Sequence, residues 1–221
     1  MDPEQLKIMG NEDYRNGRFT EALALLGEAE GAMHHFKQSG SEADPDYMRK
    51  AKQIQSHLNK CTEAKRQHDW HNLYKKTELC IAAGAHSAPL IFGLRAEALL
   101  RLNRQEEAIE SMEKGSKFEI DDCIRFFGPI GSSSVLLFRA QVDLAAGQLD
   151  EAVGFAQRAS RLDPNNKEVH AVVRRMKAAA AARTCGNELF KAARYSEAII
   201  AYGEGLGLDP YNAVLLSNRA A

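Results

Sequence analysis

The chain has 221 residues, 44% hydrophobic and 27% charged, which is the balance of a folded protein with a substantial core. Its 29 Lys and Arg nearly match its 30 Asp and Glu, whereas a general nucleic-acid-binding protein would carry a strong basic excess. No apolar run approaches the roughly 20 residues of a membrane helix, and the N-terminus lacks the apolar core of a signal peptide. We therefore expect a cytoplasmic protein without a membrane span and without a nucleic-acid partner.

The first helical pattern, in residues 1–40, predicts one or more disrupted repeats. Residues 3–26 have the alternation of small and large residues that opens a helix pair. A second-helix pattern follows directly in ALLGEAEGAMHHF, with no first helix between the two. We therefore expect at least one helix pair to be missing here. The residues of the two patterns are Gly10, Tyr14, Gly17, Phe19 and Ala22, then Gly27, Ala29, Ala32 and Phe36.

Two divergent helix pairs are predicted over residues 46–122, followed by a loop. The first pair matches the repeat pattern less well than the second. His68 and His71 fall at the turn between its helices, where we expect solvated side chains rather than a metal site. Residues 123–132 contain Gly128, Pro129, Gly131 and several serines, which predict an inserted loop. The pattern residues are Cys61, Trp70, Leu73 and Cys80, then Ala96, Leu99, Ala108, Met112 and Gly115.

A further helix pair is predicted over residues 133–166, and its ending LDPNN matches the later LDPYN. Residues 167–178 are strong helix formers without a breaker, which predicts a linker helix. We expect one long helix from Asn166 to about Ala193 that continues into the next repeat. We also expect this helix to divide the chain into two subdomains.

Residues 179–212 have the clearest pattern. Small residues at Gly186 and Ala198 allow two helices to approach closely, large residues fill the space beside them, and Pro210 ends the second helix. Two antiparallel helices in about 34 residues are the tetratricopeptide pattern. Residues 213–221 begin another first helix and stop before its partner, so we expect an all-α tetratricopeptide superhelix, truncated at the C-terminus. The pattern residues are Gly186, Leu189, Phe190, Tyr195, Ala198, Tyr202, Gly205 and Pro210.

Chemical motifs predict a binding protein rather than an enzyme. The sequence contains no metalloprotease, phosphate-loop or serine-hydrolase motif. The four cysteines include no C-x-x-C pair, so we expect reduced packing cysteines, no metal and no cofactor.

Basic and amide side chains predict a carboxylate-binding site. Lys7 precedes Asn11 by four residues and Arg183 precedes Asn187 by four, so each pair shares a helix face. Asn218 follows Asn187 by 31 residues in the next first helix, and first helices line the concave side of such a stack. A cation and two amides suit a carboxylate. The alternative is that Arg183 is solvated and the asparagines cap or pack locally.

These residues resemble those of the dicarboxylate-clamp tetratricopeptide domains. The resemblance rests on GNELF with Arg183 four before its Asn, and on SNRAA one repeat later. It implies binding of the acidic C-terminal tail of seventy- or ninety-kilodalton heat-shock chaperones. The family's clamp also needs Lys and Arg from a third first helix, which would lie beyond Ala221. For Lys7 and Asn11, the first helix with the next Asn is missing at residues 25–27.

More narrowly, the chain resembles the plant tetratricopeptide-repeat thioredoxin-like proteins. The resemblance rests on the order of the blocks at residues 9–25, 26–40, 61–70 and 182–221. It implies a disordered N-terminal region, about six repeats and a C-terminal thioredoxin-like domain in the family, and a scaffold role in stress or hormone signalling. No redox activity is implied for this chain, because it lacks C-x-x-C.

Three other interpretations stay open. In the first, the chain is the repeat region of a redox protein whose thioredoxin-like domain is missing here. In the second, it is a signalling scaffold that binds clients without chaperones. The third is a repeat co-chaperone with a J-domain, which an H-P-D tripeptide in the full gene would identify.

Overall fold

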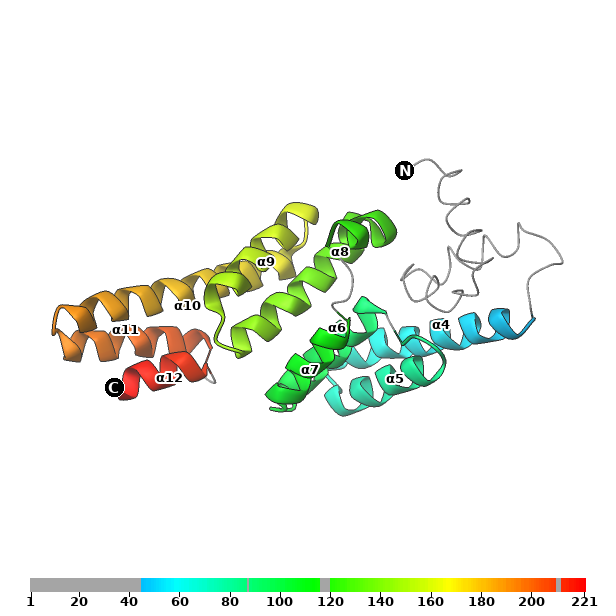
Figure 1. Cartoon of the computed structure of the whole chain (residues 1–221), viewed down its shortest axis with the longest axis horizontal. Helices are drawn as coiled ribbons and strands as arrows, with labels where there is room; N and C mark the ends of the chain where they lie inside the picture. The colour runs from blue at the N-terminus through cyan, green and yellow to red at the C-terminus, as the bar shows by residue number, and fades with distance from the viewer. Residues whose placement is uncertain (1–44, 87, 116–119, 210–211) are drawn as a thin grey trace. The chain divides into compact units, whose positions relative to one another are not determined.

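The computed structural model describes residues 45–86, 88–115, 120–209 and 212–221, and all secondary structure in these ranges is α-helical (Figure 1). The expected repeat over 1–40, with Lys7 and Asn11, lies outside them. The helices belong to two compact units, the first ending at Val135 and the second beginning at Leu136. The sequence instead predicts a division at residues 167–178. That prediction is wrong, because the helix there packs against neighbours on both sides within the second unit.

Among its described residues, the first unit contains four complete helices, and they cover the region for which the sequence predicts two pairs. They are α4 (Pro45–Arg66), α5 (Trp70–Ala82), α6 (Pro89–Arg101) and α7 (Gln105–Gly115), and each packs against the next. Asp69 begins α5, because its side chain accepts a hydrogen bond from the backbone N–H of Asn72 at 3.0 Å. The expected turn is confirmed at His68, where φ is 56°, whereas His71 lies in the first turn of α5.

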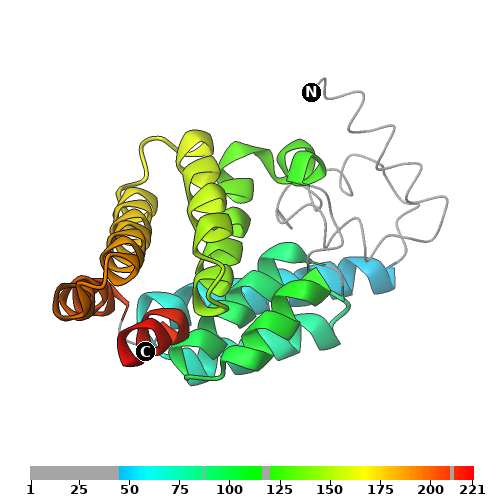
Figure 2. The same cartoon turned by 60° about the vertical axis from the view of Figure 1, so that its left-hand side comes forward.

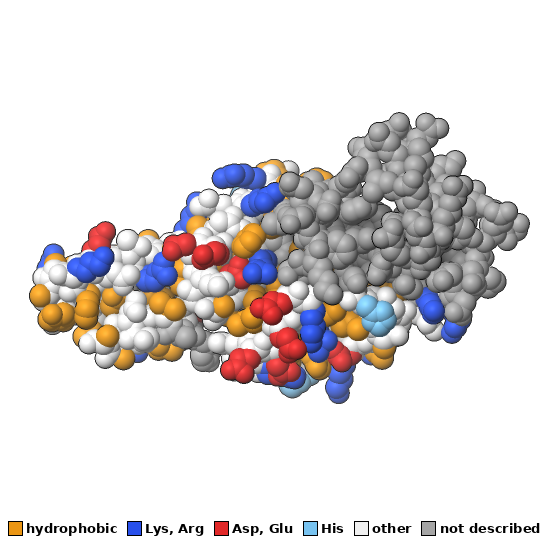
Figure 3. Space-filling view, viewed as in Figure 1, with side chains coloured by type: hydrophobic (Ala, Val, Ile, Leu, Met, Phe, Trp, Pro, Cys, Tyr) orange, Lys and Arg blue, Asp and Glu red, His pale blue; other side chains and the backbone are white. Residues whose placement is uncertain are grey.

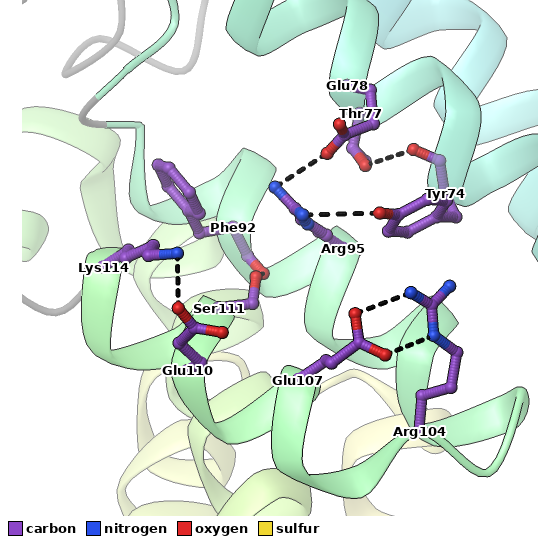
Figure 4. Close-up of polar contacts among 10 residues, drawn as sticks. All are labelled: Tyr74, Thr77, Glu78, Phe92, Arg95, Arg104, Glu107, Glu110, Ser111 and Lys114. Carbon is purple, nitrogen blue, oxygen red and sulfur yellow. Dashed lines mark hydrogen bonds and ion pairs between the residues drawn. The ribbon is translucent and has the colours of Figure 1, made fainter.

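Polar contacts tie α5, α6 and α7 together (Figure 4). Arg95 on α6 pairs through Nη1 with Glu78 on α5 at 2.7 Å, and its guanidinium lies 5.3 Å from the ring centre of Tyr74. Ser111 on α7 donates a hydrogen bond to the backbone oxygen of Phe92 at 3.2 Å. These contacts hold neighbouring helices in register around an apolar core.

Helix α8 (Ile120–Ala145) replaces the expected loop at 123–132, so that prediction is wrong. The helix breaks only at Gly128, where φ is 67° and ψ is 179°. This positive φ suits glycine, and Pro129 is tolerated after the break because a helix start has no hydrogen bond for its missing N–H. The side chain of Ser132 donates to the Gly128 oxygen at 2.8 Å and closes the first turn of the new segment. Gly and Pro thus change the helix direction without forming a loop.

The second unit contains the rest of α8 with α9 (Leu149–Leu162), α10 (Lys167–Lys191), α11 (Tyr195–Leu208) and α12 (Ala213–Ala220). Helix α10 confirms the predicted long helix. It packs against α9 and α11, and α11 packs against α12. Figures 1 and 2 both place α11 alongside α10.

The two LDP-x-N endings have the same capping geometry. The Asn166 side chain accepts from the N–H groups of Glu168 and Val169 and donates to Asp163. Asn212 accepts from the N–H of Leu215 at 3.0 Å and donates to Asp209 at 3.1 Å. Each Asn therefore caps the start of the next first helix. Asn166 caps α10 and Asn212 caps α12. Pro210 lies outside the described residues, and α11 ends at Leu208.

Candidate carboxylate-binding site

Close helix packing in the second unit positions the candidate site. A Cβ atom at Gly186 on α10 would lie 2.4 Å from Cε1 of Tyr202 on α11, so only glycine fits against this ring. A Cβ atom at Gly205 would lie 2.8 Å from Cδ1 of Leu215 on α12. The two glycines let α11 lie close to α10 and α12. The apolar cluster around them consists of Ala198, Tyr202, Leu206 and Leu215, with Leu189 against it.

The side chains of Asn187 and Asn218 meet at the edge of this cluster. Oδ1 of Asn187 accepts two hydrogen bonds, one from the Tyr202 hydroxyl at 2.8 Å and one from Nδ2 of Asn218 at 3.2 Å. Within the described residues, Nδ2 of Asn187 has no acceptor. The pair therefore has amide N–H groups to donate to an outside acceptor.

Arg183 lies one turn before Asn187 on α10 and has an acidic partner. Its Nη2 lies 2.9 Å from Oδ2 of Asp150 on α9. The Arg183 side chain is 19% exposed and that of Asp150 is 82% exposed. Nε of Arg183 is buried and has no hydrogen-bond acceptor among the described residues. In the part of the chain that the structure describes, no hydrogen bond joins Arg183 to either asparagine.

Sequence spacing predicts the meeting of Asn187 and Asn218 and misses two partners. Tyr202 is predicted as a core residue, but its hydroxyl also bonds to Asn187. The only signal of this hydrogen bond in the sequence was that residue 202 is a tyrosine, where a phenylalanine would fill the same space. Asp150 lies 33 residues before Arg183, and no pattern in the sequence relates the two.

Hydrophobic side chains gather at the surface over α11 (Figure 3). Tyr195 is 56% exposed, Ile199 51% and Ile200 63%. The ring of Tyr195 packs edge-on against Phe190 at 5.3 Å between ring centres. This surface of α11 offers apolar contact.

Other chemical features of the described residues do not form a second site. No group of three or more His, Cys, Asp or Glu is placed to hold a metal among them. Lys65 on α4 pairs with Glu97 on α6 at 2.9 Å, and this carboxylate is 4% exposed. None of the described helices is both long and apolar enough to cross a membrane.

Comparison with known proteins identifies the relatives of the chain. No family model matches the sequence. "Inactive TPR repeat-containing thioredoxin TTL3" of Arabidopsis thaliana is 34% identical over 281 residues, which cover 99% of this chain and 41% of the relative. "TPR repeat-containing thioredoxin TTL4" of the same plant is 40% identical over 208 residues, covering 92% of this chain and 30% of the relative. This chain is homologous to the plant tetratricopeptide-repeat thioredoxins. The resemblance stated from the sequence is confirmed.

The tetratricopeptide fold class is confirmed as well. The crystal structure of the P58(IPK) tetratricopeptide domain matches 93% of this chain and 57% of that chain with a TM-score of 0.51 at 15% identity. A mouse protein, "DnaJ homolog subfamily C member 7", is 29% identical over 153 residues, or 66% of this chain and 29% of that protein. This tetratricopeptide chain spans less than half the length of the curated relatives it matches.

Proposed function

We propose that this chain is a non-catalytic, cytoplasmic adaptor that binds the acidic C-terminal tail of a seventy- or ninety-kilodalton heat-shock chaperone. The role is in stress or hormone signalling. The observation that supports it best is the Asn187–Asn218 pair, which has amide donors available one turn from the cation Arg183. The homology to tetratricopeptide-repeat thioredoxins supports an interaction role in general terms.

The chemistry of these groups favours an anionic ligand. The Asn187 oxygen already accepts two hydrogen bonds, and Nδ2 of Asn187 has no acceptor among the described residues, so this amide has N–H groups available to a ligand. Amide and guanidinium donors together bind a carboxylate through charge-assisted hydrogen bonds. Asp150 occupies one nitrogen of Arg183, but the Asp150 side chain is 82% exposed, so water screens its attraction to the guanidinium. A ligand carboxylate can therefore replace it at low cost.

Isothermal titration calorimetry tests the proposal directly. A peptide ending in the acidic chaperone tail is titrated into the wild-type chain and into the Arg183→Ala, Asn187→Ala double variant. We expect the wild type to bind the peptide and the double variant to bind it with at least tenfold lower affinity. Arg194→Ala is the matched control, because Arg194 is an exposed arginine on the same unit that pairs only with Glu197 in the described part of the chain.

Each outcome of the titration has a distinct meaning. Loss of binding in the double variant alone supports the adaptor proposal. Equal binding by the wild type and the double variant contradicts this site and favours the alternative scaffold that binds clients elsewhere. Absence of wild-type binding contradicts the chaperone-tail ligand itself.

A further inference from the structure

Large hydrophobic side chains are exposed along one side of α11. Ile200 is 63% exposed, Tyr195 56% and Ile199 51%. Single exposed hydrophobic residues are ordinary, but half of the eight large exposed ones in the described part of the chain lie on this one helix. Ile199, Ile200, Gly203 and Gly207 share the side of α11 opposite its buried residues, because they follow one another at helical spacing. We call these four residues, with Tyr195, the outer face of α11.

The outer face of α11 is bulky in its N-terminal half and flat in its C-terminal half. The side chains of Tyr195, Ile199 and Ile200 protrude from the first half, and the second half contains Gly203 and Gly207. A Cβ atom at either glycine would have no atom within 4 Å, so open space lies above the backbone there. Another helix can therefore approach the second half closely and place its own side chains over the glycines.

A second copy of α11 fits this shape when it lies antiparallel to the first. Ile199 lies four residues before Gly203, and Gly207 lies four residues after it. A two-fold axis at Gly203 therefore places Ile199 of each copy over Gly207 of the other, and the two Gly203 residues meet at the axis. An interface between identical surfaces has to be self-complementary in this way. A helix with protruding side chains along its whole outer side would not meet this requirement.

Charge and area agree with contact between two copies. The outer face contains no charged residue, and the two carboxylates of α11, Glu197 and Glu204, border it along one side. Glu197 is already paired with Arg194. With the neighbouring ring of Phe190, the partly exposed side chains of the face offer on the order of 500 Å² per copy, or about 1,000 Å² in total, which is enough for a weak specific interface.

We propose that the outer face of α11 is a homodimerisation surface, on which a second copy of this chain packs with its α11 antiparallel to the first. The limited area makes this dimer weak, with a dissociation constant in the micromolar range. The inference does not rest on the proposed function, because no residue of the outer face takes part in the candidate carboxylate-binding site.

Sedimentation equilibrium of the full chain tests the proposal between about 1 µM and about 300 µM protein, a range that covers a weak interface. We expect the average mass of the wild type to rise with concentration from that of the 24.5 kDa monomer towards twice that value. A monomer at every concentration overturns the inference and leaves the outer face of α11 to a partner of another kind.

The first variant removes a protruding side chain of the face. Ile200→Lys places a charge in the apolar contact, where it would have to lose water without gaining a partner. We expect the dissociation constant of the dimer to rise at least tenfold. Ile130→Lys is the matched control, because Ile130 on α8 is 67% exposed and lies outside the face. We expect this control to dimerise like the wild type.

The second variant fills the flat half of the face and separates specific from non-specific association. In Gly203→Leu the new side chain has open space in the single chain, but it occupies the space that the second copy needs. We expect the dissociation constant to rise at least tenfold although the surface becomes more apolar. General hydrophobic association would instead become stronger. Gly154→Leu on α9 is the matched control, because a Cβ atom at Gly154 also has no atom within 4 Å.

The variants also decide which surface the two copies use. Loss of the dimer in Ile200→Lys and Gly203→Leu, with both controls unchanged, supports the outer face of α11. A dimer that persists unchanged in these two variants overturns the inference, because the copies then associate elsewhere. Melting temperatures within a few degrees of the wild type show that all four variants are folded, as expected for substitutions at exposed positions.

Discussion

At Gly186 a single hydrogen atom in place of a methyl group sets the distance between α10 and the ring of Tyr202. We predict that Gly186→Ala destabilises the chain by about 1–3 kcal/mol, because the new Cβ would overlap the ring of Tyr202, which is buried. Urea unfolding followed by circular dichroism measures the change.

Gly203→Ala is the matched control for Gly186→Ala. A Cβ atom at Gly203 in the middle of α11 would have no atom within 4 Å. Alanine there should stabilise the helix by roughly 0.5–1 kcal/mol, because it restricts the unfolded chain. If both substitutions stabilised the protein, the close packing at Gly186 would be contradicted.

Asp143 on α8 makes stability depend on pH. Burial raises the pKa of this carboxyl, and the nearby Arg139, which pairs with it at 2.9 Å, lowers the pKa less. A raised folded-state pKa means that the folded state binds the proton more tightly. The stability due to protonation is therefore fully present below the ordinary Asp pKa of about 4 and is lost as pH rises through the raised value.

The comparison with Asp143→Asn isolates this effect. We predict that the melting temperature of Asp143→Asn relative to the wild type rises as pH increases from about 4 towards neutrality, because only the wild type must bury a charge. Thermal melts at several pH values measure this difference. A constant or falling difference would contradict a raised pKa for Asp143.

The cysteines differ in how reactive their thiols should be. Cys185 is exposed, whereas Cys61 and Cys80 are buried. The Cys80 thiol donates a hydrogen bond to Cys61, which raises the pKa of Cys80 and lowers that of Cys61. Because burial blocks access to both members of the pair, we predict that a thiol reagent labels Cys185 before Cys61 and Cys80, and labels those two only when the protein unfolds. Peptide mass mapping after timed labelling checks the order, and early labelling of Cys61 would contradict it.

At the scale of single elements, the caps at Asn166 and Asn212 connect sequence to helix position. Asn166→Ala removes two hydrogen bonds to the first turn of α10 and should cost about 1 kcal/mol, within a range of roughly 0.5–2 kcal/mol. The neighbouring exposed Asn165 makes no such bond in the described chain, so Asn165→Ala should change the free energy of unfolding by less than about 0.5 kcal/mol. Equal effects of the two substitutions in urea unfolding would show that the cap contributes nothing.

How well the elements could be predicted depended on the kind of signal. The run of helix formers after Asn166 predicted α10 because nothing in it interrupts the backbone hydrogen bonds. The Gly128–Pro129 pair suggested a loop, and the prediction failed because one residue at positive φ absorbs the whole change of direction. A Gly-Pro pair indicates that a helix is interrupted, but it does not indicate how many residues the interruption contains.

At the scale of the whole molecule, the repeats made the fold predictable, but they did not predict most contacts between side chains. Spacing of 31 residues brings Asn187 and Asn218 together because each repeat places equivalent positions of its first helix side by side. Contacts that do not follow the repeat, such as Arg183 with Asp150, have no counterpart in the pattern. The division between Val135 and Leu136 was also not predicted. It lies inside helix α8, where no break in the sequence pattern marks a boundary.

The charge of the whole molecule is close to zero, so any electrostatic attraction of an acidic peptide must come from its parts. The net charge is −1, but residues 167–221 contain eight Lys or Arg against five Asp or Glu. We predict that the affinity for the acidic tail peptide falls at least threefold between about 0.05 M and about 0.5 M salt, because salt screens exposed charges over distances of several ångströms. Calorimetry at both salt concentrations measures the change, and Arg183→Ala should reduce it because that variant removes one of the cations. An affinity independent of salt would instead show that the peptide binds through apolar contacts, for which the exposed side chains of α11 are the available surface.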